Sequence, residues 1–163
     1  MVSAEPLRER ALAAAARVVD PEIPVLSIVD LGVLRGVRIE GDEVKVTITP
    51  TYSGCPAMRV IERELEAALR AAGIDKFRIE TVLAPAWTTD WLSAEGRQKL
   101  IAFGIAPPAG AASRRALFSA DAVTCPHCGS GETERISEFG STACKALYRC
   151  LSCAEPFDYF KCH

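Results

Sequence analysis

The chain contains few histidines and lacks the spacings on which several classes of enzyme depend. Its two histidines are His127 and His163. A Ser-His-Asp hydrolase needs a histidine between its nucleophile and its acid, and a di-iron bundle needs Glu-x-x-His pairs on two of its four long helices. Gly32 and Gly36 do not form the glycine-rich turn that binds a dinucleotide. We therefore expect no complete catalytic centre in this chain alone.

The chain also lacks an excess of charge and a long apolar run. Its formal net charge is −2, and residues 105–163 carry six basic and six acidic groups. Phosphate contacts require a basic excess, so nucleic acid is not an expected partner. No apolar run approaches the roughly 20 residues that span a bilayer. The first residues, Met-Val-Ser-Ala-Glu-Pro, contain no apolar export signal. We expect a cytoplasmic protein with no membrane partner.

Cysteine, in contrast, is abundant and regularly spaced. The chain has seven cysteines, an odd number that disfavours a fully disulfide-bonded framework. Four of them form two Cys-x-x-Cys pairs, Cys125 with Cys128 and Cys150 with Cys153, separated by 21 residues. Four thiolates on two facing turns can surround a zinc ion at bond lengths of about 2.3 Å. This spacing predicts a structural zinc ribbon, although such a site also takes iron. Two disulfides or redox dithiols are the alternative.

The composition divides the chain into two domains. Residues 105–122 are rich in alanine, with two prolines and a glycine, and show no sustained period, which predicts a linker. Residues 1–104 are numerous enough to bury a core, whereas residues 123–163 need a bound metal to offset their ordering entropy. We therefore expect an α+β domain over residues 1–104 and a small β zinc-ribbon domain over residues 123–163.

Apolar periodicity predicts the elements of both domains. The first domain should contain a small mixed sheet of about three strands covered by helices, with a hairpin turn at residues 40–43 and Ser93 as the N-cap of its last helix. The second should contain the short strands of a ribbon. We predict helices over residues 4–19, 57–72 and 93–103, and strands around residues 37–39, 44–48, 77–83, 132–138, 145–150 and 156–161.

Cys55 is a further candidate for chemistry. It stands directly before Pro56, a residue suited to the first turn of a helix. The free N–H groups and the positive end of the helix dipole would favour a thiolate, which is the form that binds iron or zinc. The alternative is an inert cysteine that packs as a small apolar side chain.

Two further clusters are ambiguous. Asp20 and Glu22 flank Pro21 at the end of the first predicted helix, and they form either a polar rim near Cys55 or a solvated turn. Trp87 and Trp91 are the only tryptophans, four residues apart. They form either an aromatic surface for a partner, where such residues are enriched, or a plug over the sheet.

These motifs together carry a family resemblance. Residues 8–103 resemble the small iron–sulfur assembly domain of SufT-like proteins through Asp20-Pro21-Glu22-Ile23-Pro24, Ile28-Val29-Asp30-Leu31-Gly32, and Thr51 followed by Gly54-Cys55-Pro56. Residues 125–163 look like the tail of the PaaD (or PaaJ) family, notably at residues 139–146 and 156–163. The two parts in this order resemble PaaD over nearly the whole chain. That family belongs to the phenylacetyl-CoA 1,2-epoxidase system of aerobic phenylacetate breakdown.

The resemblance implies a function that the residues alone do not. It implies a maturation factor that assists iron or iron–sulfur centre assembly in the epoxidase, docks on oxygenase or reductase subunits, and contains structural zinc. Cys55 would bind iron or a cluster transiently, with Asp20, Glu22, Asp30 and Thr51 as motif residues around it. The alternative is a structural adaptor in which Cys55 handles no metal.

One cysteine cannot hold a cluster, so further ligands are needed. They would come from a second copy of the chain in a homodimer, from the client protein, or from Cys144, Cys162 or His163. Cys144 precedes a predicted strand in a Gly/Ser/Thr loop, which suits an exposed thiol. Cys162 alternates with Phe160, so simple packing is its alternative.

Overall fold

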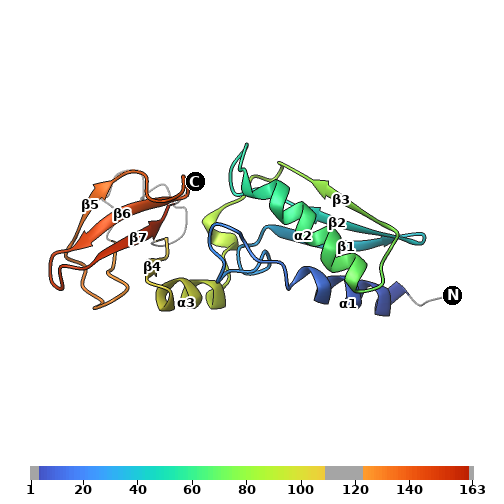
Figure 1. Cartoon of the computed structure of the whole chain (residues 1–163), viewed down its shortest axis with the longest axis horizontal. Helices are drawn as coiled ribbons and strands as arrows, with labels where there is room; N and C mark the ends of the chain where they lie inside the picture. The colour runs from blue at the N-terminus through green and yellow to red at the C-terminus, as the bar shows by residue number, and fades with distance from the viewer. Residues whose placement is uncertain (1–3, 109–122, 162–163) are drawn as a thin grey trace. The chain divides into compact units, whose positions relative to one another are not determined.

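The computed structural model describes residues 4–108 and 123–161, which form two compact units, residues 1–87 and 88–163 (Figure 1). Each unit contains a small mixed sheet, with helices on one face in the first unit and a short helix next to strand β4 in the second, and the predicted α+β class with a terminal ribbon is confirmed. None of the described helices is both long and apolar enough to cross a membrane.

The first unit contains a three-stranded sheet in the order β1-β2-β3. Strands β1 (Leu34–Glu40) and β2 (Glu43–Ile48) form an antiparallel hairpin, and Gly41 takes a left-handed φ of 66° in its turn. Strand β3 (Phe77–Thr81) pairs with β2 in parallel, and helix α2 (Ala57–Ala71) forms the crossover that a parallel pair requires. The sheet is therefore mixed.

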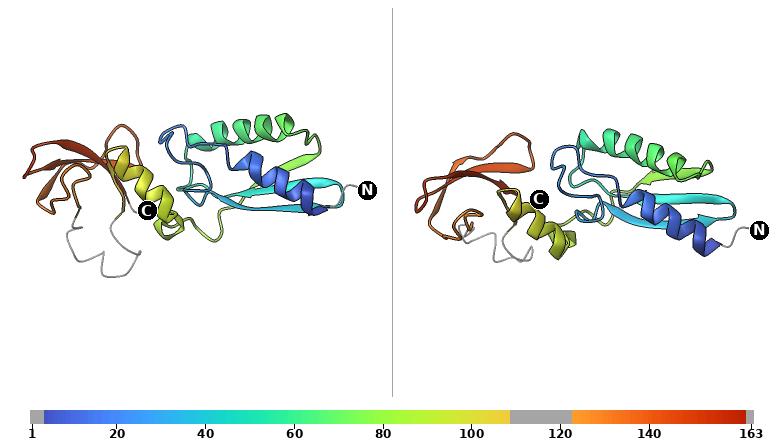
Figure 2. Two further views of the ribbon diagram at one scale, coloured as in Figure 1. Left: turned by 90° about the horizontal axis from the view of Figure 1, so that it is seen from below. Right: turned by 60° about the horizontal axis from the view of Figure 1, so that its bottom comes forward.

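The two helices of this unit lie on one face of the sheet (Figure 2). The buried side chains alternate along β2, where Val44, Val46 and Ile48 are fully covered, and they meet the apolar stripe of α2. The opposite face is charged, with Lys45 Nζ lying 2.9 Å from a carboxylate oxygen of Glu80. The core side chains supplied by α1 (Ala4–Ala15) and α2 include Ala11, Ala15, Ile61, Leu65 and Leu69.

The first helix ends earlier than predicted, at Ala15 instead of residue 19. Its last turn tightens, because the N–H groups of Arg17 and Val18 bond to carbonyls three residues back, at Ala14 and Ala15. The chain then turns through an irregular loop at residues 19–33, joined to itself by a single bridge between Val19 and Ser27. We call this segment the motif loop, since it contains Asp20, Glu22 and Asp30.

The second unit is built around the sheet β4-β7-β6-β5. Its core is small and contains Val123, Ala146, Phe157 and Tyr159, with the ring of Tyr148 packed against it. Strands β5, β6 and β7 form an antiparallel meander, and β4 pairs with β7 in parallel. The strands span Ile105–Ala106 (β4), Thr133–Ser137 (β5), Lys145–Cys150 (β6) and Pro156–Phe160 (β7).

Helix α3 (Ala94–Ala102), preceded by the short 3-10 helix η1 (Thr89–Trp91), belongs to this second unit. The expected N-cap is present, because Ser93 Oγ accepts a hydrogen bond of 2.9 Å from the N–H of Gly96. We expected this helix in the first domain and a linker from residue 105. Strand β4 instead pairs with β7, and the Arg97 guanidinium donates to the carbonyl oxygens of Thr89 and Pro108. Residues 109–122 of the expected linker lie outside the described residues.

Candidate functional site

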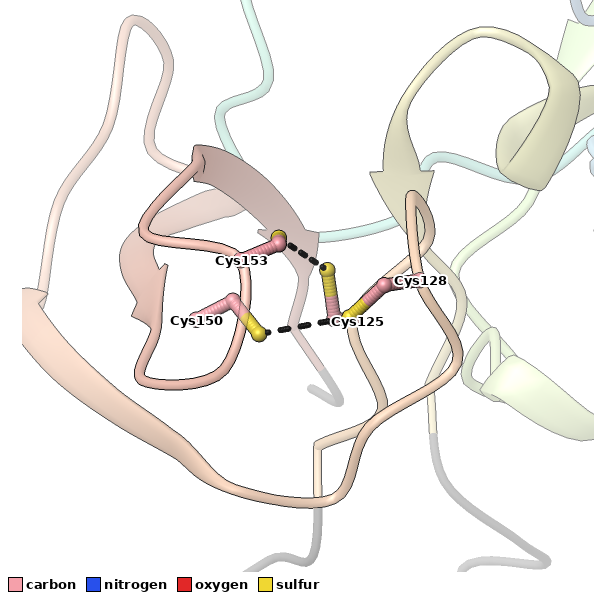
Figure 3. Close-up of side chains that lie close together, drawn as sticks. All are labelled: Cys125, Cys128, Cys150 and Cys153. Carbon is pink, nitrogen blue, oxygen red and sulfur yellow. Dashed lines mark hydrogen bonds between the residues drawn. The ribbon is translucent and has the colours of Figure 1, made fainter.

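The four cysteines of the two Cys-x-x-Cys pairs converge in the second unit. Their sulfur atoms all lie within 4.8 Å of one another. Figure 3 shows the two turns facing each other, with Cys125 Sγ 3.8 Å from Cys153 Sγ and Cys128 Sγ 3.5 Å from Cys150 Sγ. Sulfur atoms around a tetrahedral ion at 2.3 Å are separated by about 3.8 Å, whereas a disulfide requires about 2.05 Å. The site therefore fits a metal ion, and the disulfide alternative is not formed.

Backbone geometry holds each pair of sulfurs in place. In the first turn, the N–H of Gly129 donates to the carbonyl of Cys125, and the N–H of His127 points at Cys125 Sγ at 3.4 Å. Gly129 has a φ of 77°, the conformation expected after this pair. In the second turn, Ala154 takes the equivalent place with a φ of 63°. Sequence reasoning missed Ala154, because alanine rarely adopts this conformation.

The two cysteines of the second turn differ in the pKa of their thiols. Backbone N–H groups, first that of Cys153, lower the pKa of Cys150 to about 6 against the effect of its removal from water. The pKa of Cys153 is raised to about 12. The backbone N–H of Glu155 lowers this pKa, but removal from water and the sulfurs of Cys150, Cys128 and Cys125 together raise it by more. Adjacent thiolates repel one another, so a bound cation stabilises several thiolates at such a site.

Cys55 lies half-buried just before helix α2, as the sequence predicted. Burial raises the pKa of the Cys55 thiol above its ordinary value, and the carboxylates of Glu22 and Asp20 raise it further. The N–H of Ala57 and the hydroxyl of Tyr52 bond to the sulfur and lower the pKa, but by less. The expectation that the helix N-terminus leaves a thiolate here is wrong, since burial and two negative charges favour the neutral thiol.

The same interactions place the motif loop beside Cys55. Asp20 and Glu22 are near enough for their charges to raise the pKa of the sulfur, and a polar rim of metal-handling residues stays a prediction. Asp20 is itself buried, and its Oδ1 accepts hydrogen bonds from the N–H groups of Glu22 at 2.7 Å and Ile23 at 2.9 Å. It therefore shapes the turn and positions Glu22.

Asp30 shapes the other end of the motif loop. Its Oδ2 accepts from the N–H of Ser27 and its N–H donates to Ser27 Oγ, both at 3.0 Å, in a reciprocal pair. Thr51 is half-buried in the segment that leads to Cys55. Sequence reasoning missed Tyr52 in that segment, and it missed Thr49, whose buried Oγ1 has no hydrogen-bond partner among the described residues. A buried hydroxyl without a protein partner is a place for an ordered water.

The remaining candidate ligands from the sequence are Cys144, Cys162 and His163. Cys144 is buried, with its sulfur 3.1 Å from Thr142 Oγ1, so the prediction of an exposed thiol is wrong. Its carbonyl accepts from the N–H of Lys161, which continues the pairing of β6 with β7 and carries the side chain inward. Cys162 and His163 lie outside the described residues.

Trp87 does not form an exposed aromatic surface. It is 4% exposed, and its Nε1 donates a hydrogen bond of 2.7 Å to the carbonyl of Leu31. The alternative interpretation, a plug packed in the fold, fits Trp87, whereas Trp91 is half-buried in η1.

An α+β domain with a cysteine before its second helix, followed by a four-cysteine ribbon, defines an iron–sulfur-assembly type of protein extended by a metal-binding module. Residues 8–82 match the family described as "Iron-sulfur cluster assembly protein", and residues 109–161 match the "PaaD zinc beta ribbon domain". The chain belongs to the PaaD family.

Three similar proteins support this assignment. The chain is 51% identical over 143 residues to a putative 1,2-phenylacetyl-CoA epoxidase component of Escherichia coli (strain K12), covering 88% of this chain and 86% of that one. It is 36% identical over 103 residues to "Fe-S protein maturation auxiliary factor YitW" of Bacillus subtilis (strain 168), covering 62% of this chain and 97% of the relative. A crystal structure of a DUF59 domain from Bacillus anthracis matches with a TM-score of 0.55 at 25% identity, covering 60% of this chain and 94% of that one.

Proposed function

We propose that this protein is a maturation factor of a phenylacetyl-CoA epoxidase system, and that it carries iron or an iron–sulfur cluster on Cys55 to an oxygenase or reductase subunit. The single observation that carries this proposal is a half-buried Cys55 directly before helix α2, near enough to Glu22 and Asp20 of the motif loop for their charges to act on its sulfur. The names of the relatives, an epoxidase component and an iron–sulfur maturation factor, support the same system and the same activity.

The geometry suits transient binding more than permanent binding. A carrier must bind its cargo and then release it, and one half-buried thiol with carboxylates nearby offers few ligands. The negative charges of Glu22 and Asp20 attract a cation, while the raised pKa keeps the empty sulfur protonated and therefore poorly reactive towards oxidants. Arrival of iron displaces the thiol proton, which leaves for solvent or for a neighbouring carboxylate.

The four ribbon cysteines have a separate role in this proposal. They hold one zinc ion, which stabilises the second unit and takes no part in delivery of the cargo. The small apolar core of that unit, seven buried residues in one cluster, supports this role, because a core of that size leaves much of the folding free energy to the metal.

A structural adaptor remains the competing function, since burial of Cys55 is also what an inert cysteine shows. Substitution of Cys55 by serine separates the two, and Cys144→Ser is the matched control because Cys144 is a buried thiol in the other unit. With the ribbon first saturated with zinc, protein loaded anaerobically with ferrous iron and sulfide should lose its thiolate-to-iron absorption in Cys55→Ser and keep it in Cys144→Ser.

The same variants test delivery. Co-expression of Cys55→Ser with the epoxidase components should lower the iron content of the oxygenase while the complex still assembles. Unchanged iron content in both variants, together with no absorption in the loaded wild-type protein, would establish the adaptor and end the carrier proposal.

A further inference from the structure

The two edges of the three-stranded sheet differ in how their backbone groups are satisfied. On the β1 side, Arg8 of α1 donates from Nε to the carbonyl oxygen of Val37 at 3.1 Å. A side chain of this unit therefore occupies a backbone acceptor of that edge. Edge strands are commonly protected in such ways, because their free N–H and C=O groups pair readily with another strand.

The outer edge of β3 has no such cover among the residues that the structure describes. The carbonyl of Lys76 accepts from Val44 and the N–H of Val82 donates to Ile48, so the even-numbered residues between them direct their backbone groups at β2. The N–H and C=O groups of Phe77, Ile79 and Thr81 consequently point away from the sheet. Figure 1 shows β3 as the outer strand.

A groove runs beside this edge, between β3 and α2. Its volume is about 360 Å³ and it is lined by Glu62, Glu66, Arg70, Asp75, Phe77 and Ile79. Most of its exposed lining is polar and comes from the four charged residues, while Phe77 and Ile79 add a small apolar area on the helix face of the strand. An open strand edge beside a helix is the arrangement in which domains bind an extended peptide by strand addition.

The charge of the groove is predominantly negative. Glu66 is paired with Arg70 at 3.3 Å, and the Arg70 guanidinium lies over the ring of Phe77 at 5.3 Å. Glu62 accepts a hydrogen bond of 2.9 Å from the Thr81 hydroxyl, and no described cation pairs with the exposed Asp75. Three carboxylates against one guanidinium leave a net charge of −2 in the groove.

We infer that the outer edge of β3 is a docking site for an extended segment of a partner protein that carries lysine or arginine at alternate positions. The segment adds a strand through the outward groups of Phe77, Ile79 and Thr81. Every second side chain then projects over α2, where its ammonium or guanidinium meets Glu62 and Asp75. This site shares no residue with Cys55, so it does not depend on metal handling.

A second copy of this chain fits the edge less well. Two β3 strands paired edge to edge would bring the carboxylates of both grooves together, and like charges disfavour the contact. The outer strand of the ribbon, β5, is a weaker candidate for strand addition, because its register shifts between Arg135 and Ser137.

The test uses the whole protein labelled with nitrogen-15 and an acetylated eight-residue peptide of alternating lysine and valine. At a peptide concentration about nine times Kd, exchange of the Phe77, Ile79 and Thr81 amides should slow about ten-fold, because only the free tenth exchanges. A glutamate–valine peptide of the same length should leave these amides unchanged.

Two variants test separately the charge of the groove and the outward backbone N–H groups of β3. Glu62→Gln should weaken the affinity for the lysine–valine peptide by roughly 2- to 5-fold. Glu64→Gln, the same change two residues along α2, should alter that affinity by less than about 1.5-fold. Ile79→Pro removes one outward N–H without touching the bonds to β2 and should abolish binding. Protection at other residues, equal binding of the glutamate peptide, or concentration-dependent protection of β3 without peptide would overturn the inference.

Discussion

The indole nitrogen of Trp87 donates a hydrogen bond of 2.7 Å to the carbonyl oxygen of Leu31, 56 residues earlier in the chain. Leu31 lies near the end of the motif loop, whose other end contains the two carboxylates that raise the pKa of Cys55. A residue that looked like part of a docking surface thus holds the loop of the candidate cargo site.

Replacement of Trp87 by phenylalanine keeps an aromatic ring and removes the donor. The Leu31 carbonyl would then be buried without its partner, which should destabilise the first unit by about 1–3 kcal/mol. Urea unfolding followed by far-ultraviolet circular dichroism measures this difference. Trp91→Phe is the matched control and should leave the first unit's transition in place; equal stability of Trp87→Phe and wild type would show that the bond does not hold the loop.

Removal of one ribbon ligand should unfold the second unit alone. Cys125→Ser leaves three thiolates, lowers zinc content, and should expose residues 123–161 to proteases while the first unit stays folded. Limited proteolysis with mass spectrometry and elemental analysis measure both effects. A strong chelator should produce the same fragments from the wild-type protein, and unchanged zinc in Cys125→Ser would contradict the ligand assignment.

Alkylation of Cys55 should be slow at neutral pH. The folded pKa is raised, so the thiolate that reacts with iodoacetamide accumulates only above the usual cysteine range of about 8.5. The unfolded chain loses this proton first, and stability therefore falls as the pH rises between the unfolded and folded pKa values.

Glu22→Gln removes one of the charges that raise this pKa, so the alkylation rate at pH 8 should increase roughly two-fold. Glu64 does not contribute to the raised pKa of Cys55, so Glu64→Gln should leave the alkylation rate unchanged. A rate for the wild-type protein equal to that of an unfolded cysteine peptide would remove the basis of this prediction.

Asp30 should matter to stability more than an exposed aspartate does. Asp30→Ala removes the Oδ2 acceptor of the Ser27 N–H, while the backbone N–H at position 30 can still donate to Ser27 Oγ, and it should lower the free energy of unfolding by about 1 kcal/mol. Asp42→Ala, which removes an exposed ion pair with Lys76, should change it by less than about 0.5 kcal/mol. Chemical denaturation of the two variants compares them directly, and equal losses would deny Asp30 its structural role.

The sequence predicted most where spacing alone determines geometry. The Cys-x-x-Cys pairs, the hairpin at Gly41 and the cap at Ser93 each depend on a few adjacent residues, and each appears as expected. The class of the fold followed from periodicity for the same reason.

It predicted least where distant segments meet. The loop sequence around Cys144 predicts an exposed thiol, but the Cys144 carbonyl accepts a hydrogen bond from the N–H of Lys161, which extends the pairing of β6 with β7. The helix N-terminus before Ala57 predicted a thiolate at Cys55, but burial of the sulfur raises its pKa, and carboxylates more than 30 positions away add to that increase. A local sequence pattern does not show the pairing of Lys161 with Cys144 or the burial of Cys55, because both arise only after the chain has folded.

The two metal-binding turns end in different residues at the same left-handed position, Gly129 in one and Ala154 in the other. Alanine in that conformation costs roughly 1–2 kcal/mol that glycine avoids. The Cys150 turn therefore closes against a steric penalty that the Cys125 turn does not meet. A bound ion must then supply the free energy that keeps Ala154 in this conformation.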